Sequence, residues 1–130
     1  MMTHILALME RSKVHSNWTV SDIWRLIMPP LFRGQFVEDT IGNNPIGIAT
    51  YGFFSDEAWN GYRTGFRKLR EEDFNSGDNI VLIDVIAPYS NAKKLMYQLR
   101  DKLRREGHRG KYISFIRKYS DHRKVQKVMI

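Results

Sequence analysis

The stretch "NIVLIDVIAP", residues 79–88, decides the fold of this chain of 130 residues. It is the most apolar stretch of the sequence and has the length of a strand. Side chains alternate between the two faces of a strand. We therefore expect Ile80, Leu82, Asp84 and Ile86 on one face and Val81, Ile83, Val85 and Ala87 on the other. Because both faces are apolar, the pattern predicts a central strand that is covered on both sides.

The segment that follows this strand predicts a long amphipathic helix. In "NAKKLMYQLRDKLRREG", residues 91–107, Asn91 suits the N-cap and Gly107 suits the end. The buried stripe consists of Ala92, Leu95, Met96, Leu99 and Leu103. The opposite face carries the basic residues Lys93, Lys94, Arg100, Lys102, Arg104 and Arg105. A strand followed by such a helix is typical of a sheet with helices packed on it.

The rest of the chain alternates shorter helical and extended patterns. A helix is expected at 3–11, and a second one within 16–30 that ends at Pro29 and Pro30. A third helix is expected from the N-cap Ser55 onward, with Trp59, Tyr62 and Phe66 facing the sheet. Strands are expected at 31–40 and 46–54 across the turn "IGNNP", and at 111–119 and 123–130 across "SDH", with 71–78 as a loop. We predict one domain over residues 1–130, of the α/β or α+β class, with a mixed sheet of about five strands.

The composition narrows the classes of function. The chain has no cysteine, which excludes disulfides, thiolate zinc sites and a cysteine nucleophile and is compatible with a reducing cytosol. No apolar run approaches the roughly 18 residues of a membrane helix. The net charge is +7, so the expected partner is acidic: a nucleic acid, an anionic membrane surface or an acidic protein. The basic residues are not interleaved with exposed aromatic residues, which argues against nucleic acid without excluding it.

Asp84 stands out in the apolar strand because a buried carboxylate is costly unless it has a partner. An arginine would be the structural partner, and a histidine would be the catalytic one. His15, in "KVHSNWTV", fits either a structural histidine at a helix junction or that catalytic partner. His4 is near the N-terminus, His108 follows the glycine that ends a helix, and His122 is expected in a polar turn, so we expect His108 and His122 to be solvated. We find no helical pair of histidines with a third ligand, so we predict no metal site.

Two separated motifs resemble the lysine acyltransferases that activate RTX toxins, the hemolysin-activator family. The first is "SKVHSNWTV" followed by "MPP", and the second is "FNSGDNIVLIDVIAPYSNAKKLMYQLRDKL". Between them, "PIGIATYGFFSDEA" is also similar to a stretch of that family. The resemblance covers roughly residues 8–105 and implies a fold similar to the GNAT acetyltransferases.

The resemblance implies a fatty acyl transfer from acyl carrier protein to an internal lysine of a protein acceptor, by a cytoplasmic homodimer. The catalytic histidine and aspartate of the family correspond to His15 and Asp84, and Ser12, Asn17 and Trp18 are expected to contact substrate. His15 would act either as a general base or as a nucleophile that carries the acyl group.

The resemblance implies acyl carrier protein as the donor of the acyl group. No tightly bound cofactor is expected, and the junction "APYSNAK" lacks the glycine turn that holds the pyrophosphate of coenzyme A in GNAT enzymes. Acyl carrier proteins are acidic, and Lys93, Lys94 and Arg100 would suit one, although a solvated basic face explains them as well.

The chain departs from the family in two ways. It is shorter than typical members, mostly at the C-terminus, and Leu26 stands where the family commonly has an asparagine. Two alternatives therefore stay open. One is a GNAT-like enzyme that acylates a small amine or a nucleobase, and the other is a binding module for an acidic partner that has lost the chemistry.

Overall fold

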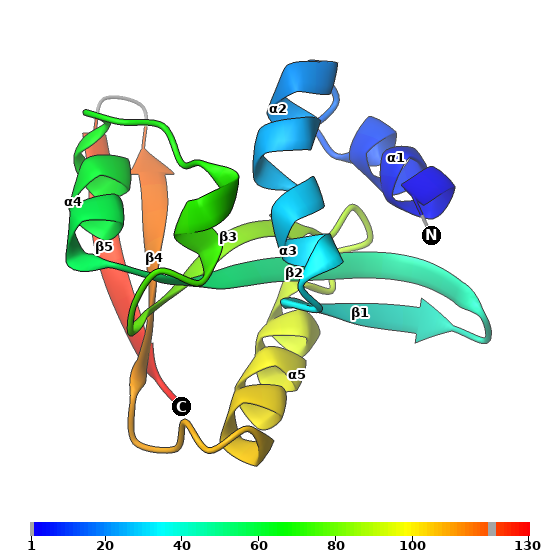
Figure 1. The fold of residues 1–130 in the computed structure, drawn as a ribbon. Helices are drawn as coiled ribbons and strands as arrows, with labels where there is room; N and C mark the ends of the chain where they lie inside the picture. The colour runs from blue at the N-terminus through cyan, green and yellow to red at the C-terminus, as the bar shows by residue number, and fades with distance from the viewer. Residues whose placement is uncertain (1, 120–121) are drawn as a thin grey trace.

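The computed structural model describes residues 2–119 and 122–130, and β3 (Asn79–Ile86) lies in the middle of its sheet. The strand order is β1-β2-β3-β4-β5 (Figure 1). The other strands are β1 (Phe36–Ile41), β2 (Asn44–Phe54), β4 (Tyr112–Tyr119) and β5 (His122–Met129). Neighbouring strands are antiparallel except β3 and β4, which are parallel and are joined through α5 (Ala92–Arg105). The expected mixed α+β fold and the central position of β3 are confirmed.

Helices cover both faces of the sheet (Figure 1). On one face α5 buries Leu95, Leu99 and Leu103 completely against β2, β3 and β4. On the other face lie α1 (Met2–Arg11), α2 (Val20–Leu26) and α3 (Met28–Phe32). Their buried side chains Ile5, Leu8, Met9 and Ile27 pack on Ile48 of β2 and Ile86 of β3. The apolar character of both faces of β3 thus follows from its position between two helical layers.

A β-bulge changes which face each residue of β3 occupies. Thr50 of β2 pairs with Asp84, but the next residue, Tyr51, pairs with Leu82, so Ile83 has no partner on β2. Before the bulge, Leu82 packs in the apolar cluster formed with α5 on one face of the sheet. Beyond the bulge, Val85 packs in that same cluster. The prediction that Ile80, Leu82, Asp84 and Ile86 share one face is therefore wrong. Because one extra residue reverses the alternation, Asp84 lies on the same face as Ile86, toward the N-terminal helices.

The helix α4 (Asp56–Thr64) begins after the expected N-cap Ser55 but ends before Phe66, which was expected to lie on its sheet-facing side. The Ser55 hydroxyl accepts a hydrogen bond from the Ala58 amide at 3.1 Å, which caps the first turn. Gly65 ends the helix in the left-handed conformation, with φ of 78°. Phe66 consequently lies outside the helix and is 91% exposed, so its expected packing on the sheet is wrong.

Two further boundaries differ from the prediction. Pro29 and Pro30 do not end the helical segment but occupy the first turn of α3, where a missing amide hydrogen costs little. Helical structure therefore continues to Phe32, and β1 begins at Phe36 instead of residue 31. The loop expected at 71–78 contains the short 3-10 helix η1 (Glu71–Phe74). Of the expected "SDH" turn, Ser120 and Asp121 lie outside the described residues.

Candidate functional site

His15 and Asp84 are in contact. His15 lies in the turn that follows α1, where its amide donates to the Ser12 carbonyl at 3.2 Å. Its side chain is 4% exposed, and its Nε2 is hydrogen-bonded to Asp84 Oδ1. Within residues 2–119 and 122–130 no arginine or lysine forms an ion pair with Asp84. The partly buried carboxylate is therefore partnered by the histidine, and the bulge at Ile83 is what turns it toward that ring.

Ser12 contacts the other ring nitrogen. Its Oγ lies 2.6 Å from His15 Nδ1. With the Asp84 carboxylate ionised and the ring neutral, Nε2 carries the hydrogen that bonds Asp84 and Nδ1 is left with a lone pair, because an ionised carboxylate only accepts hydrogen bonds. The Ser12 hydroxyl then donates to Nδ1. Ser12, His15 and Asp84 form one continuous hydrogen-bonded chain, which is an arrangement suited to moving a proton.

A cavity of about 950 Å³ opens beside this chain, where β3 and β4 separate. The two parallel strands pair only at Ile80↔Ile113 and Val81↔Ser114. Residues beyond those pairs on both strands line the cavity. The apolar part of the lining includes Trp18, Leu26, Leu69, Ile83, Val85 and Ile116. A cavity of this size and character can hold a drug-sized or larger apolar ligand.

Of the three residues expected to contact substrate, two line the cavity and one does not. Trp18 lines the cavity, and its ring centroid lies 4.9 Å from that of His15. Ser12 lines the cavity too, whereas Asn17 is exposed and does not. Leu26, at the end of α2, also lines the cavity and adds an apolar side chain to it. A capping box between Thr19 and Asp22 fixes the start of α2.

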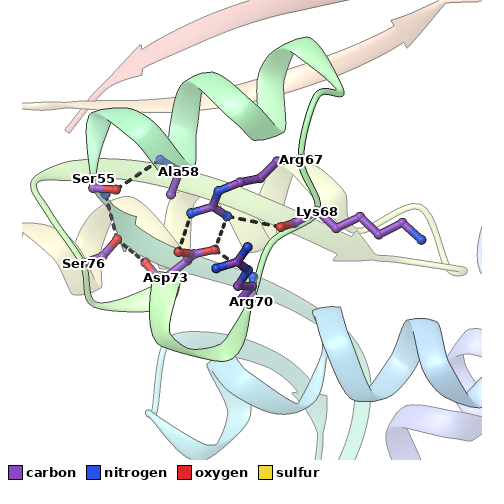
Figure 2. A network of polar contacts seen from close by, with 7 residues as sticks. All are labelled: Ser55, Ala58, Arg67, Lys68, Arg70, Asp73 and Ser76. Atoms are coloured by element: carbon purple, nitrogen blue, oxygen red, sulfur yellow. Dashed lines mark hydrogen bonds and ion pairs between the residues drawn. The ribbon is translucent and has the colours of Figure 1, made fainter.

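A polar network holds the loop after α4 in place (Figure 2), and Arg67, Lys68 and Leu69 of this loop line the cavity. Asp73, which is 5% exposed, accepts hydrogen bonds from the Arg67 guanidinium at 2.6 and 2.9 Å and from the Arg70 amide at 2.8 Å. Ser76 Oγ donates to the Asp73 carbonyl and accepts from the Ser55 amide, which joins the loop to the start of α4. The hydrogen bonds from Arg67 hold the pKa of Asp73 below its usual value, although burial opposes this.

The basic residues of α5 lie outside the cavity. Lys93 and Lys94 are exposed, Arg100 is half-buried, and none of the three lines it. Lys94 forms an ion pair of 2.8 Å with the buried Asp39. Asn91 begins α5 without a side-chain cap and instead donates to Asp39 at 2.7 Å. The hydrogen bonds from Asn91 and then Lys94 lower the pKa of Asp39.

Several residues at the cavity were not foreseen from the sequence. They are the cationic Arg25, Arg67, Lys68 and Arg117, together with Leu69. Arg67 and Lys68 lie in the basic run "FRKLR", but nothing in that run indicates that it adjoins α2 and β4 in space. Among the described residues there is no group of three or more His, Cys, Asp or Glu that could hold a metal ion, and no helix suited to cross a membrane.

Comparisons with known proteins agree with the resemblance noted in the sequence. A family model described as "HlyC: RTX toxin acyltransferase family" matches residues 1–130. An uncharacterised protein of Synechocystis is 30% identical over 101 residues, which cover 76% of this chain and 69% of that protein. Lysine-acyltransferase RtxC of Vibrio cholerae is 26% identical over 79% of this chain and 68% of its own length. Protein-lysine myristoyltransferase HlyC of Escherichia coli is 31% identical over 76% and 57%, respectively.

Proposed function

The chain belongs to the RTX toxin acyltransferase family, and we propose that this acyltransferase moves a fatty acyl group from acyl carrier protein to a lysine side chain of a protein acceptor. The observation that carries this function is the chain of hydrogen bonds from Ser12 through His15 to Asp84 at a largely apolar cavity. The relatives from Vibrio cholerae and Escherichia coli are a lysine-acyltransferase and a protein-lysine myristoyltransferase, which supports the lysine acceptor.

The reaction replaces one acyl bond by another. The lysine amine attacks the carbonyl carbon of the thioester, a C–N bond forms, and the C–S bond breaks as the thiolate leaves. The amine loses one proton and the thiolate gains one. In this proposal His15 Nδ1 takes the proton through the Ser12 hydroxyl and returns it to the sulfur. Asp84 keeps the ring in the tautomer with Nε2 protonated and stabilises the cation that forms.

His15 can instead be drawn as a nucleophile that carries the acyl group before the lysine attacks. The geometry favours the general base. His15 is 4% exposed and both of its nitrogens already have partners, so direct attack on a thioester would require Ser12 to move away from Nδ1. A proton relay needs no such movement. A stable mass increase of the protein in the presence of donor alone, lost in His15→Ala, would instead identify an acyl-enzyme.

The donor in this proposal is an acidic carrier protein, which suits a chain with a net charge of +7. Lys93, Lys94 and Arg100 of α5 contact that carrier. Trp18 contacts substrate within the cavity, and Asn17, which is exposed and lies outside the cavity lining, contacts substrate at the surface. The enzyme works in the cytoplasm as a homodimer, as the family resemblance implies. It holds no tightly bound cofactor, because the thioester brings an already activated acyl group.

Acyl transfer from a panel of acyl carrier proteins to host proteins, followed by mass spectrometry, tests the proposal. Wild-type protein should acylate lysines, and His15→Ala and Asp84→Ala should lose the activity while their circular dichroism stays unchanged. No product with any donor, or full activity of His15→Ala, would refute the proposal. Acylation of a small amine or nucleobase from coenzyme A thioesters alone would assign a different substrate class.

A further inference from the structure

The catalytic cavity has a surplus of positive charge that an acyl chain does not explain. Four cationic residues line it, namely Arg25, Arg67, Lys68 and Arg117. Asp84 is the acidic residue that lines it, and it is engaged with His15. An acyl chain is uncharged, and an acceptor lysine would be repelled by these groups. The cations therefore indicate an anionic portion of a substrate.

The four cations differ in how far they are already paired. Arg67 makes two hydrogen bonds with Asp73, and Arg25 Nη2 lies 3.4 Å from Asp22 Oδ1. Lys68 and Arg117 are exposed, and their side chains have no hydrogen bond or ion pair with any other described residue. These two cations are available to a ligand without breaking an existing pair.

Lys68 and Arg117 reach the cavity from two separate elements. Lys68 lies in the loop that Asp73 holds, and Figure 2 shows Arg67 turned toward Asp73 while the Lys68 side chain points away from that network. Arg67 Nη1 also donates to the Lys68 carbonyl at 3.2 Å, which fixes the backbone at this position. Arg117 belongs to β4, beyond the point where that strand separates from β3. The Arg67–Asp73 pair is thus a positioning device for Lys68.

We propose that Lys68 and Arg117, assisted by Arg25, bind the phosphate of the 4′-phosphopantetheine arm that carries the acyl thioester. This inference rests on the proposed function. The arm has a thiol at one end and a phosphate at the other, so a cavity with a proton-transfer chain and two unpaired cations matches both ends. Hydrogen bonds from cationic groups to phosphate are among the stronger ones in proteins. Carrier protein and coenzyme A both present this phosphate.

Binding of non-reactive thioethers tests the site without requiring transfer. The probes are S-alkyl 4′-phosphopantetheine and S-alkyl pantetheine, which lacks the phosphate, titrated by calorimetry. Wild-type protein should bind the phosphorylated probe roughly tenfold more tightly, and added salt should reduce that preference. Lys68→Glu with Arg117→Glu should abolish the preference and leave binding of S-alkyl pantetheine unchanged. Both residues are exposed, so the fold should tolerate the change.

Arg109→Glu is the matched control, since Arg109 is exposed in the turn between α5 and β4 and does not line the cavity. It should keep the preference for phosphate. Equal binding of both probes to wild-type protein, no binding of either, or the same loss in Arg109→Glu would overturn the inference. Asp73→Asn should weaken the preference through Lys68, and Asp73→Asn with unchanged preference would overturn the positioning role.

The two proposals fail in different ways. Preference for the phosphorylated probe together with no acyl transfer from any donor would support the site and refute the proposed reaction. Acyl transfer at equal kcat/KM from acyl pantetheine and acyl phosphopantetheine would support the proposed reaction and refute the phosphate site. Thioethers on intact carrier protein and on coenzyme A distinguish the sources. The source that the site accepts should bind wild-type protein and lose affinity in Lys68→Glu with Arg117→Glu, and unchanged affinity of both ligands in that variant would overturn the inference.

Discussion

Replacing Asp84 with asparagine tests whether the charge of this carboxylate, and not only its shape, supports catalysis. The amide keeps an oxygen that can accept the hydrogen bond from His15 Nε2, but the negative charge is lost. When His15 takes a proton at Nδ1, opposite unit charges about 4 Å apart attract by about 4 kcal/mol at an effective dielectric constant of 20. Because the Asp84 side chain is 13% exposed, solvent screens part of this attraction. A loss of about 2–4 kcal/mol predicts a fall in kcat of roughly 30- to 900-fold.

The assay is single-turnover transfer of an acyl group, followed by mass spectrometry of the acceptor. The fold should survive, because losing the charged character of one hydrogen bond costs about 1 kcal/mol, or about 4 °C in Tm for a chain of this size. Asp101→Asn is the matched control, since Asp101 is exposed on α5 and, among described residues, its carboxylate forms an ion pair with Arg105 alone, at 3.7 Å. Equal rates for the two folded variants would refute the reasoning about charge.

Three further changes test other parts of the structure. Asp73 has a lowered pKa in the folded chain, so its pairing with Arg67 stabilises the fold above about pH 4 and is lost as the pH falls through that lowered pKa. The difference in urea unfolding between wild type and Asp73→Asn should therefore shrink from pH 6 to pH 2, and a constant difference would contradict this. Leu99→Ala should cost about 2–5 kcal/mol in urea unfolding, because Leu99 is fully buried under the sheet. Ser12→Ala should lower kcat roughly tenfold or more and leave KM unchanged if the hydroxyl relays the proton, whereas an unchanged or higher kcat would favour direct attack by His15.

Local patterns were sufficient for the main elements of this fold. The apolar run at 79–88 indicated a central strand, and the periodic stripe of Leu95, Leu99 and Leu103 indicated a buried helix, because both patterns arise from the repeat of the backbone itself. Boundaries were less predictable. The sequence predicts a helix end at Pro29 and Pro30, but these residues lie in the first turn of the next helix, since proline is tolerated in a first turn and disfavoured only further inside.

The site could be predicted only in part. A carboxylate in an apolar strand requires a partner, which made Asp84 conspicuous in the sequence, and the resemblance to a family suggested His15. The cationic side chains of the cavity had no such signal, because a basic residue in a loop looks the same whether it faces solvent or a cavity. Their grouping depends on which segments the fold brings together.

The amino-acid sequence alone was enough to define a mixed sheet, a covered central strand and a buried acid in need of a partner, since these follow from hydrophobicity and backbone periodicity. The face on which that acid lies followed only from the assembled sheet. Regular alternation would have placed Asp84 with Leu82 on the α5 side. The unpaired Ile83 reverses the alternation and turns Asp84 toward His15. Such a bulge reflects how β3 pairs with β2, and the residues of β3 alone do not show where the extra residue falls.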